Sequence, residues 1–276
     1  MPIFMDRHNV WETTAADVAA AHRRDLEVQD RYGVRFLTYW FDESRGTIFC
    51  LVDAPDKESA QCVHREAHGQ VAGEIVEVPL AVVEAFLGRI QDPAPQPGQA
   101  PGDNLDAAHR TIMFTDIVGS TEITARLGDR RATELVRAHD SIVRRCLAAC
   151  DGREVKHTGD GIMAAFPDSA RGVACAIRIQ RAFAHYNSDS HGGEPIHVRI
   201  GLDSGEPVED SNDLFGTTVQ RAARICNAAE TDQILVTDTV RSEHGNAELF
   251  QVLGRRQLKG FAAPVDVALC VWSDRR

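Results

Sequence analysis

The stretch Phe114-Thr115-Asp116-Ile117-Val118-Gly119-Ser120-Thr121 decides how this chain is interpreted. It continues an apolar run that starts at Arg110 and predicts a β-strand, and it ends in small residues that commonly begin a helix. Asp116 therefore stands at a strand end, beside the exposed backbone N–H groups of a helix start. Because carboxylates bind Mg²⁺ and helix N-termini bind phosphate, this order predicts a nucleotide–metal site.

A second acidic loop, Thr158-Gly159-Asp160-Gly161, lies at the predicted turn between strands 153–156 and 162–166. In a ferredoxin-like sheet the first strand lies beside the second strand of that hairpin, so Asp116 and Asp160 are expected to meet at one end. Paired carboxylates can hold two Mg²⁺ ions, which suits in-line displacement at phosphorus. Taken singly, Asp116 could be a helix cap and Asp160 a turn residue. Together they favour a metal site.

The composition is that of a folded protein with 276 residues, of which 43% are hydrophobic and 26% charged. The formal net charge of -11 argues against a nucleic-acid or anionic-membrane partner, but a nucleotide can still bind through Mg²⁺. Seven cysteines without a CxxC pair predict free thiols in a reducing cytoplasm. The N-terminal residues contain no long apolar run, so we expect a cytoplasmic protein without direct membrane insertion.

A proline-rich segment, residues 92–104, divides the chain. Its four prolines and lack of apolar residues predict a linker over 91–104, between a domain at 1–90 and a domain at 105–276. The fold class is α+β, with two ferredoxin-like (split βαβ) domains, the second one elaborated. Expected strands are 2–6, 34–40, 47–52, 75–78, 110–114, 153–156, 162–166, 196–202, 234–236, 250–252 and 265–271. Expected helices are 14–32, 56–69, 80–90, 120–150, 168–186 and 217–229.

The second domain resembles the catalytic domain of class III nucleotidyl cyclases, the adenylyl/guanylyl cyclase family, over nearly all of residues 108–272. The matching segments, in the family's order, are FTDIVGST (114–121), KHTGDG (156–161), RIGLDSG (199–205), DLFGTTV (213–219), AAR (222–224) and LKG (258–260). Any one of these alone would be a weak signal, but the ordered set is specific. The resemblance implies an adenylate cyclase in signal transduction, which converts ATP to 3′,5′-cyclic AMP and pyrophosphate.

The resemblance also implies roles for individual residues. Asp116 and Asp160 match the two metal-binding aspartates, for two Mg²⁺ or Mn²⁺ ions per active site. Lys156 and Asp213 match the pair that reads the purine. Lysine can donate to adenine N1 and aspartate can accept from its exocyclic amine, whereas the family's guanylyl cyclases carry Glu and Cys there. The alternative is a solvated strand-end lysine and an ordinary loop aspartate.

Arg224 matches the arginine that stabilises the transition state, a role suited to a fixed guanidinium; the alternative is a surface arginine. The family usually has Asn four residues earlier, where this chain has Gln220. The extra methylene displaces the amide by roughly an ångström, which can matter about 10²-fold in rate. Lys259, in a late loop, is expected to contact the triphosphate or to be a surface lysine.

In the family the site lies between two protomers of a head-to-tail dimer, so the resemblance implies a homodimer with ATP as ligand. The alternative, based on Gln220, is a catalytically weak or inactive cyclase-like nucleotide-binding regulatory module. A different phosphotransferase on a related sheet would require the pair of Lys156 and Asp213 to be coincidental.

The first domain is rich in groups that bind transition metals, with His64 and His68 four residues apart on one predicted helix face. Residues 1–78 resemble a small bacterial family described as nickel-binding, ferredoxin-like and dimeric. The matching segments are MDRH (5–8), His22 and Asp25, GV (33–34), YW (39–40), CLVDAP (50–55) and HREAHG (64–69). We expect Ni²⁺ or another transition metal at His8, His22, His64 and His68, with regulation of the cyclase as a hypothesis. The alternative is that several of these are buried or surface histidines without metal. Cys50 and Cys62 are interpreted as thiols without metal.

Overall fold

The computed structural model describes residues 1–92, 106–189, 193–207 and 216–273. The chain divides into two compact units, which we call unit 1 (Met1–His109 with Pro207–Gly216) and unit 2 (Arg110–Glu206 with Thr217–Arg276). Most of the predicted linker lies outside the described residues, so its extent and the domain bounds stay predictions. Among the described residues, no helix has the length and apolar character needed to cross a membrane.

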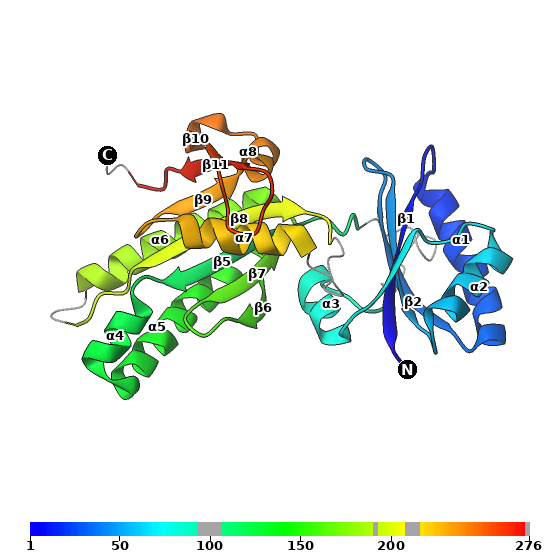
Figure 1. Cartoon of the computed structure of the whole chain (residues 1–276), viewed down its shortest axis with the longest axis horizontal. Helices are drawn as coiled ribbons and strands as arrows, with labels where there is room; N and C mark the ends of the chain where they lie inside the picture. The colour runs from blue at the N-terminus through cyan, green and yellow to red at the C-terminus, as the bar shows by residue number, and fades with distance from the viewer. Residues whose placement is uncertain (93–105, 190–192, 208–215, 274–276) are drawn as a thin grey trace. The chain divides into compact units, whose positions relative to one another are not determined.

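Unit 1 is a four-stranded antiparallel sheet in the order β2-β3-β1-β4, with α1 and α2 against one face (Figure 1). This is the strand order of the ferredoxin-like fold, so that prediction is confirmed. Its elements are β1 (Ile3–Asn9), α1 (Ala15–Val28), η1 (Gln29–Tyr32), β2 (Arg35–Asp42), β3 (Thr47–Asp53), α2 (Lys57–Ala67), β4 (Glu74–Glu77) and α3 (Leu80–Leu87).

Local sequence explains where the helices of unit 1 begin. Thr14 and Asp17 form a capping box, and Asp56 accepts a hydrogen bond from Ser59 N at 2.8 Å. Two predictions were inaccurate in detail. The first helix turns 3₁₀ after Val28, and β1 extends beyond Asp6 to Asn9, which places His8 within the sheet.

Unit 2 is a seven-stranded sheet in the order β10-β11-β9-β8-β5-β7-β6. Its four strands β8-β5-β7-β6 repeat the ferredoxin-like order, and β9 adds parallel to β8. Its elements are β5 (Arg110–Ile117), α4 (Ser120–Leu127), α5 (Asp129–Ala148), β6 (Arg153–His157), β7 (Ile162–Phe166), α6 (Ser169–Asp189), β8 (Val198–Gly205), α7 (Gly216–Ala228), β9 (Ile234–Thr237), α8 (Asp238–His244), η2 (Ala247–Leu249), β10 (Phe250–Arg256) and β11 (Val265–Cys270).

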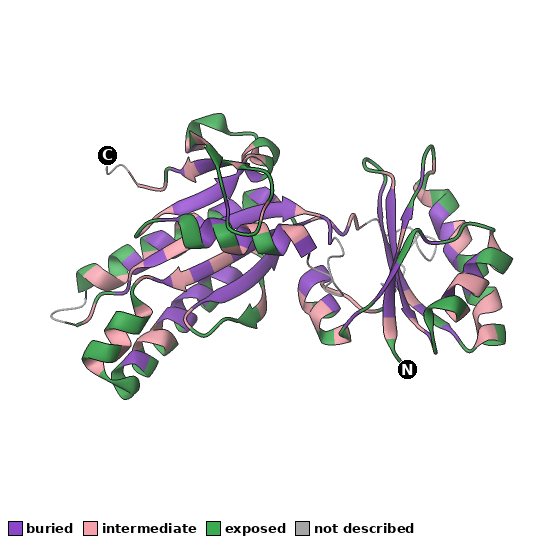
Figure 2. Cartoon of the chain, in the orientation of Figure 1, coloured by how far each residue is buried: buried purple, intermediate pink, exposed green. Residues whose placement is uncertain are grey.

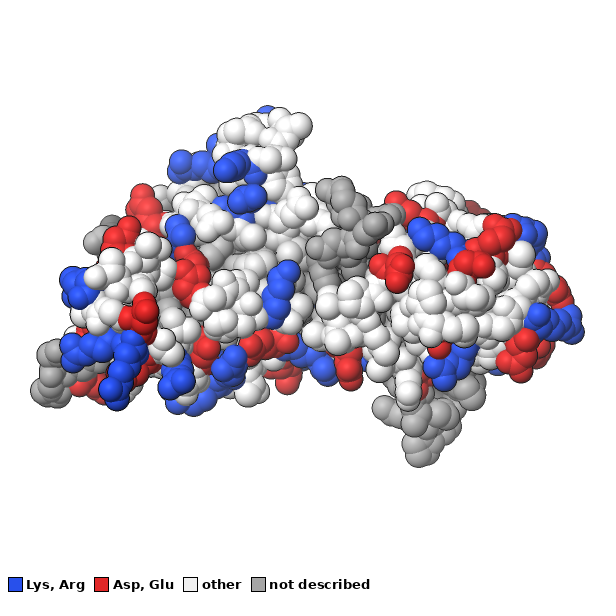
Figure 3. Space-filling model, turned by 60° about the horizontal axis from the view of Figure 1, so that its bottom comes forward, with Lys and Arg blue, Asp and Glu red and all other residues white. Residues whose placement is uncertain are grey.

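The central strands of unit 2 are buried on both faces (Figure 2). One core joins them to α5, α6 and α8, and a second core joins α7 to β9 and β11. The helix predicted over 120–150 is interrupted at Gly128, whose φ of 79° begins a new helix direction. On the face shown in Figure 3, acidic and basic side chains are interspersed rather than gathered into one field.

Candidate functional site

Asp116 lies near the end of β5, and the turn that carries Asp160 is hydrogen-bonded to the same strand end. Ile117 N donates to the Asp160 carbonyl at 3.1 Å, and Ile162 N donates to Thr115 Oγ1 at 3.0 Å. Gly161 permits this close approach, since a Cβ there would stand 1.9 Å from the Thr115 carbonyl oxygen. The structure therefore brings both aspartates to one end of the sheet.

The two carboxylates carry negative charge that the protein only partly compensates. Burial raises the pKa of Asp116, and the nearby charge of Asp160 raises it further, while Arg199 acts in the opposite direction. Arg199 faces Asp116 across the β5–β8 ladder, with Nε 2.7 Å from Asp116 Oδ2. Ser120 Oγ donates to Asp160. A half-buried pair of oxygen ligands with excess negative charge is a donor set that fits Mg²⁺ or Mn²⁺.

Gln220 and Arg224 lie one helical turn apart on the exposed side of α7. The opposite side is fixed by close packing on β8, since a Cβ at Gly201 would stand 2.2 Å from Cys226 N. Lys156 on β6 and Lys259 after β10 are exposed as well. Within the described ranges, no hydrogen bond or ion pair joins these four side chains to the aspartates. Asp213 lies outside the described residues.

Sequence reasoning missed a chain of polar groups behind the aspartates. His139 on α5 lies fully buried, with Nε2 3.3 Å from Thr115 Oγ1 and Nδ1 3.0 Å from Asp140 Oδ1. Asp140 Oδ2 is 3.0 Å from Nε2 of His157, the residue next to Lys156. Burial lowers the pKa of His139. These hydrogen-bonded groups link β5, α5 and β6, and so hold in place the strand ends that carry the candidate site.

A second missed feature is the buried Asp203, which accepts from Arg221 Nε at 2.7 Å and from Thr237 Oγ1 at 2.8 Å. Burial raises the pKa of Asp203, against the effect of Arg221. These bonds connect β8, α7 and β9, so Arg221 has a structural role. Arg224 lies on the outer side of the same helix. A periodic pattern cannot show this pairing, because the partners lie on three separate elements.

We expect Asp203→Ala to destabilise unit 2 by about 3 kcal/mol, because it leaves Arg221 and Thr237 without their acceptor. The midpoint of denaturant unfolding measures the change. Asp266→Ala is the matched control, since that carboxylate is exposed and lies 3.8 Å from Arg255; we expect it to cost under about 1 kcal/mol. Equal effects of the two substitutions would contradict a structural role for Asp203.

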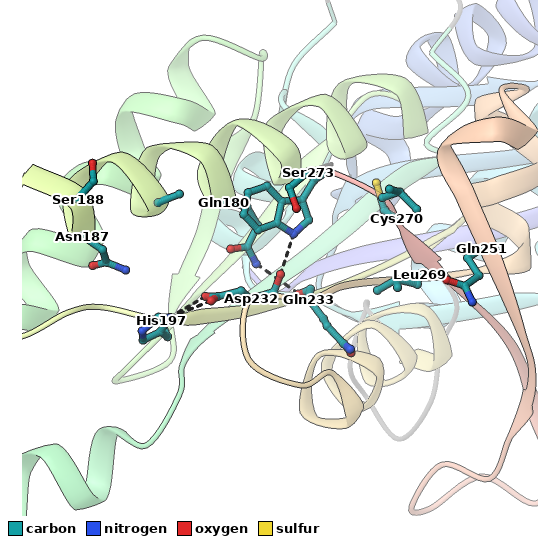
Figure 4. A pocket seen from close by; sticks show the side chains of 13 residues that line it. Gln180, Asn187, Ser188, His197, Asp232, Gln233, Gln251, Leu269, Cys270 and Ser273 are labelled. Atoms are coloured by element: carbon teal, nitrogen blue, oxygen red, sulfur yellow. Dashed lines mark hydrogen bonds and ion pairs between the residues drawn. The ribbon is translucent and has the colours of Figure 1, made fainter. Parts of the chain in front are cut away.

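A separate cavity of about 800 Å³ opens on unit 2 between α6, β11 and the turn that precedes β9 (Figure 4). At one side His197 Nδ1 lies 2.9 Å from Asp232 Oδ2, and Trp272 Nε1 donates to the Asp232 carbonyl at 2.7 Å. None of the predicted site residues lines this cavity. Its size alone therefore does not make it the candidate active site.

Unit 1 gathers a buried polar cluster between its sheet and α1 and α2. Asp6, His8, Cys50 and His64 each offer a ligand atom within 4.8 Å of the others, and Asp25, His64 and His68 form a second such group. Of the four predicted histidines, His8, His64 and His68 thus meet. His22 lines a small cavity together with these three histidines, but its Nε2 pairs with Asp92 at 2.9 Å. Cys50, interpreted from the sequence as an ordinary thiol, lies inside the first group.

His64 lies between two carboxylates, with Nε2 2.9 Å from Asp6 Oδ2 and Nδ1 3.1 Å from Asp25 Oδ1. Burial acts to lower the pKa of His64, but the two aspartates raise it to about 10. The pKa of Asp6 falls below its usual range because the effects of His64 and His8 outweigh burial. Burial raises the pKa of the Cys50 thiol, and Asp6 adds to that effect. Asp6 and Asp25 therefore flank His64 on both sides of its ring.

Comparison with known proteins agrees with both units. Residues 106–266 match the family described as the adenylate and guanylate cyclase catalytic domain, and residues 4–78 match the family described as nickel responsive protein SCO4226-like. The chain belongs to the class III adenylate/guanylate cyclase family, because the first match covers more than half of it. The second match comes first in the chain, as the sequence predicted.

Relatives and solved structures are similar over the cyclase region. An adenylate cyclase of Streptomyces coelicolor is 30% identical over 180 residues, which cover 63% of this chain and 45% of the relative. A putative adenylate cyclase 3 of Rhizobium meliloti is 28% identical over 166 residues, 59% of this chain and 28% of the relative. The chain thus spans less than half the length of these relatives. A Trypanosoma brucei adenylate cyclase structure has a TM-score of 0.53 at 22% identity, covering 61% of this chain and 92% of its own, which shows the shared fold.

Proposed function

We propose that this chain is an adenylate cyclase that converts ATP to 3′,5′-cyclic AMP and pyrophosphate. The observation that carries the proposal is the pair of Asp116 and Asp160, held at one end of the sheet with negative charge that Arg199 only partly compensates. Membership of the cyclase family and the adenylate cyclase names of the relatives support it. The reaction is attack of the ribose 3′-hydroxyl on the α-phosphate.

Asp116 and Asp160 would hold two Mg²⁺ or Mn²⁺ ions. Metal bound there would supply Lewis-acid activation of the hydroxyl and stabilisation of the charge that develops on the phosphate. Arg199 and Ser120 orient the two carboxylates through their hydrogen bonds. The network from Thr115 to His157 keeps the turn and the strand end in register. The protein thus supplies a preorganised oxygen site rather than a proton acceptor.

We propose that the active unit is a homodimer with two composite sites. Arg224 projects from the exposed side of α7 and forms no ion pair within the described part of the chain, so it is available to a second protomer. In this arrangement one protomer contributes the aspartates. The other contributes Arg224, Gln220 and the purine-reading pair of Lys156 and Asp213, with Lys259 near the triphosphate. A guanidinium fixed on a helix can stabilise the transition state by electrostatic preorganisation.

Base preference gives a direct prediction. The double substitution Lys156→Glu with Asp213→Cys should move the ratio of ATP to GTP turnover towards GTP by about tenfold to a hundredfold, because the hydrogen-bond pattern then suits guanine. Initial rates with each nucleotide measure the ratio. Lys57→Glu is a control for the charge change, since Lys57 begins α2 in unit 1. An undiminished preference for ATP would show that the purine pair is misassigned.

A second candidate function, a weak or inactive nucleotide-binding module, is favoured by Gln220 at the exposed position one turn before Arg224. We expect Gln220→Asn to raise kcat, by up to about 10²-fold if the longer amide misplaces its donor. Single-turnover rates and ATP affinity measured together check this. A silent wild type with a strongly active variant would favour the regulatory module, whereas equal rates would remove Gln220 as a reason for doubt.

We further propose that unit 1 binds a transition metal and adjusts the cyclase, with Ni²⁺ as the first candidate from its family. The experiment that tests the whole proposal is a product assay of the full chain with ATP and with GTP, in Mg²⁺ or Mn²⁺, with and without Ni²⁺. Cyclic AMP as the main product supports the enzyme. An unchanged rate and oligomeric state on adding Ni²⁺ and Zn²⁺ would remove the regulatory part.

A further inference from the structure

The polar cluster of unit 1 is built by the sheet register. Asp6 and His8 are two apart on β1 and so share one face, and Asp6 is the cross-strand partner of Cys50 on β3. α2 packs over this face and brings His64 within 2.9 Å of Asp6. β1, β3 and α2 therefore bring one carboxylate, one thiol and two imidazole groups close together.

The buried carboxylate at this point is contacted by two imidazole groups. Asp6 Oδ1 and His8 Nε2 are shielded from solvent and form an ion pair at 3.3 Å, while His64 Nε2 approaches the other Asp6 oxygen at 2.9 Å. Asp6 is 0% and His8 6% exposed. Buried ionisable groups are stabilised by pairing or by coordinating a metal, so this convergence favours a shared cation.

The space beside His8, Cys50 and His64 is small. A cavity of about 20 Å³ adjoins the cluster, and His8, Cys50 and His64 line it together with Asp25 and His68. That volume is enough for one water-sized particle and too small for an organic ligand. A ligand of that size is a single water molecule or ion.

We propose that Asp6, His8, Cys50 and His64 form a buried site for one divalent first-row transition-metal ion, with Cys50 as a thiolate ligand. This rests on the proposed role of unit 1 in binding a transition metal, and it adds two ligands, Asp6 and Cys50, that the sequence pattern did not single out. Thiolate and imidazole favour Zn²⁺, Co²⁺ or Ni²⁺ over Mg²⁺ and Ca²⁺.

The geometry suits four-coordinate binding. Metal–ligand distances of about 2.0–2.3 Å place the ligand atoms of a tetrahedral site about 3.3–3.8 Å apart. The four groups already lie within 4.8 Å of one another, so small side-chain rotations close the site.

The imidazole of His64 is oriented by a carboxylate on its other side. Its Nε2 faces Asp6, while Nδ1 lies 3.1 Å from Asp25 Oδ1 on α1. This carboxylate–histidine arrangement is the usual support for a histidine metal ligand. Asp25 is thus a positioning residue, and α1 is coupled to the site through it.

Co²⁺ binding to the metal-free full chain tests the site, because thiolate coordination gives a near-ultraviolet charge-transfer band that oxygen-only sites cannot give. We expect this band to saturate at one equivalent of Co²⁺ per chain. Cys50→Ser should abolish it, whereas Cys62→Ser should retain it, since Cys62 lies outside the cluster. Asp25→Asn should retain the band but weaken binding by about 10–100-fold.

X-ray absorption of the Co²⁺-loaded wild type is the second measurement, and it needs no variant to fold; one sulfur neighbour is expected. A spectrum with only nitrogen and oxygen ligands, a band that survives Cys50→Ser, or no bound Co²⁺ would each overturn the site and leave a structural hydrogen-bond network. These readouts do not depend on turnover. A thiolate site without any metal effect on the cyclase rate would keep this inference and end the regulatory proposal. A metal effect on the rate without thiolate coordination would keep the regulatory proposal and end this inference.

Discussion

Asp116→Ala is expected to lower the rate of cyclic AMP formation by at least about 10³-fold, because it removes a ligand on which both metal-dependent steps rely. Asp116 is half-buried, and Arg199, which donates to it, also donates to the Asn227 carbonyl at 3.1 Å, so the guanidinium keeps a partner when Asp116 is replaced. The fold should therefore survive. Product formation by chromatography, with Mg²⁺ and with Mn²⁺, measures the loss.

The matched control for this variant is Glu134→Ala, an exposed acidic residue on α5. It should leave the rate within about twofold of the wild type, as expected for a surface substitution. Asp116→Asn adds a sharper comparison, since it keeps the side-chain volume and removes only the charge. A wild-type rate equal to that of Asp116→Ala would end the enzyme proposal, because background hydrolysis would then explain all product.

The order of elements in both units could be predicted from the sequence, because strands and helices alternate with clear turn and cap signals. Thr14, Asp56 and Gly33 each mark a helix end where the structure has one. The meeting of Asp116 and Asp160 followed from strand order alone. The interruption at Gly128 was missed because the apolar period continues across it, although its positive φ requires a break.

The buried partners could not be predicted, because they depend on register and packing between distant elements. His64 and Asp6 are 58 residues apart, and only the pairing of β1 with β3 places Asp6 opposite Cys50. The cysteine pattern shows no CxxC, so composition favours an ordinary thiol for Cys50. In the same way, Asp203 resembles any strand residue until Arg221 and Thr237 surround it.

Arg224→Ala is expected to lower kcat by about 10²–10³-fold with little change in ATP affinity, because its guanidinium acts on charge that develops in the transition state. The side chain is exposed on α7 and alanine favours helix, so the fold should be unaffected. Arg181→Ala, an exposed arginine on α6, is the matched control and should keep full activity. A large rise in KM with unchanged kcat would instead indicate ground-state binding by Arg224.

Mixing the two inactive variants then tests whether each site is shared between protomers. A heterodimer of Asp116→Ala with Arg224→Ala contains one site with both defects and one site with none. Random exchange of equal amounts should therefore restore about a quarter of the wild-type rate, since half of the dimers are mixed and each has one intact site. If both groups acted within one protomer, no mixture could recover activity. Recovery that rises and falls with the fraction of mixed dimers would thus place Asp116 and Arg224 on opposite sides of one interface.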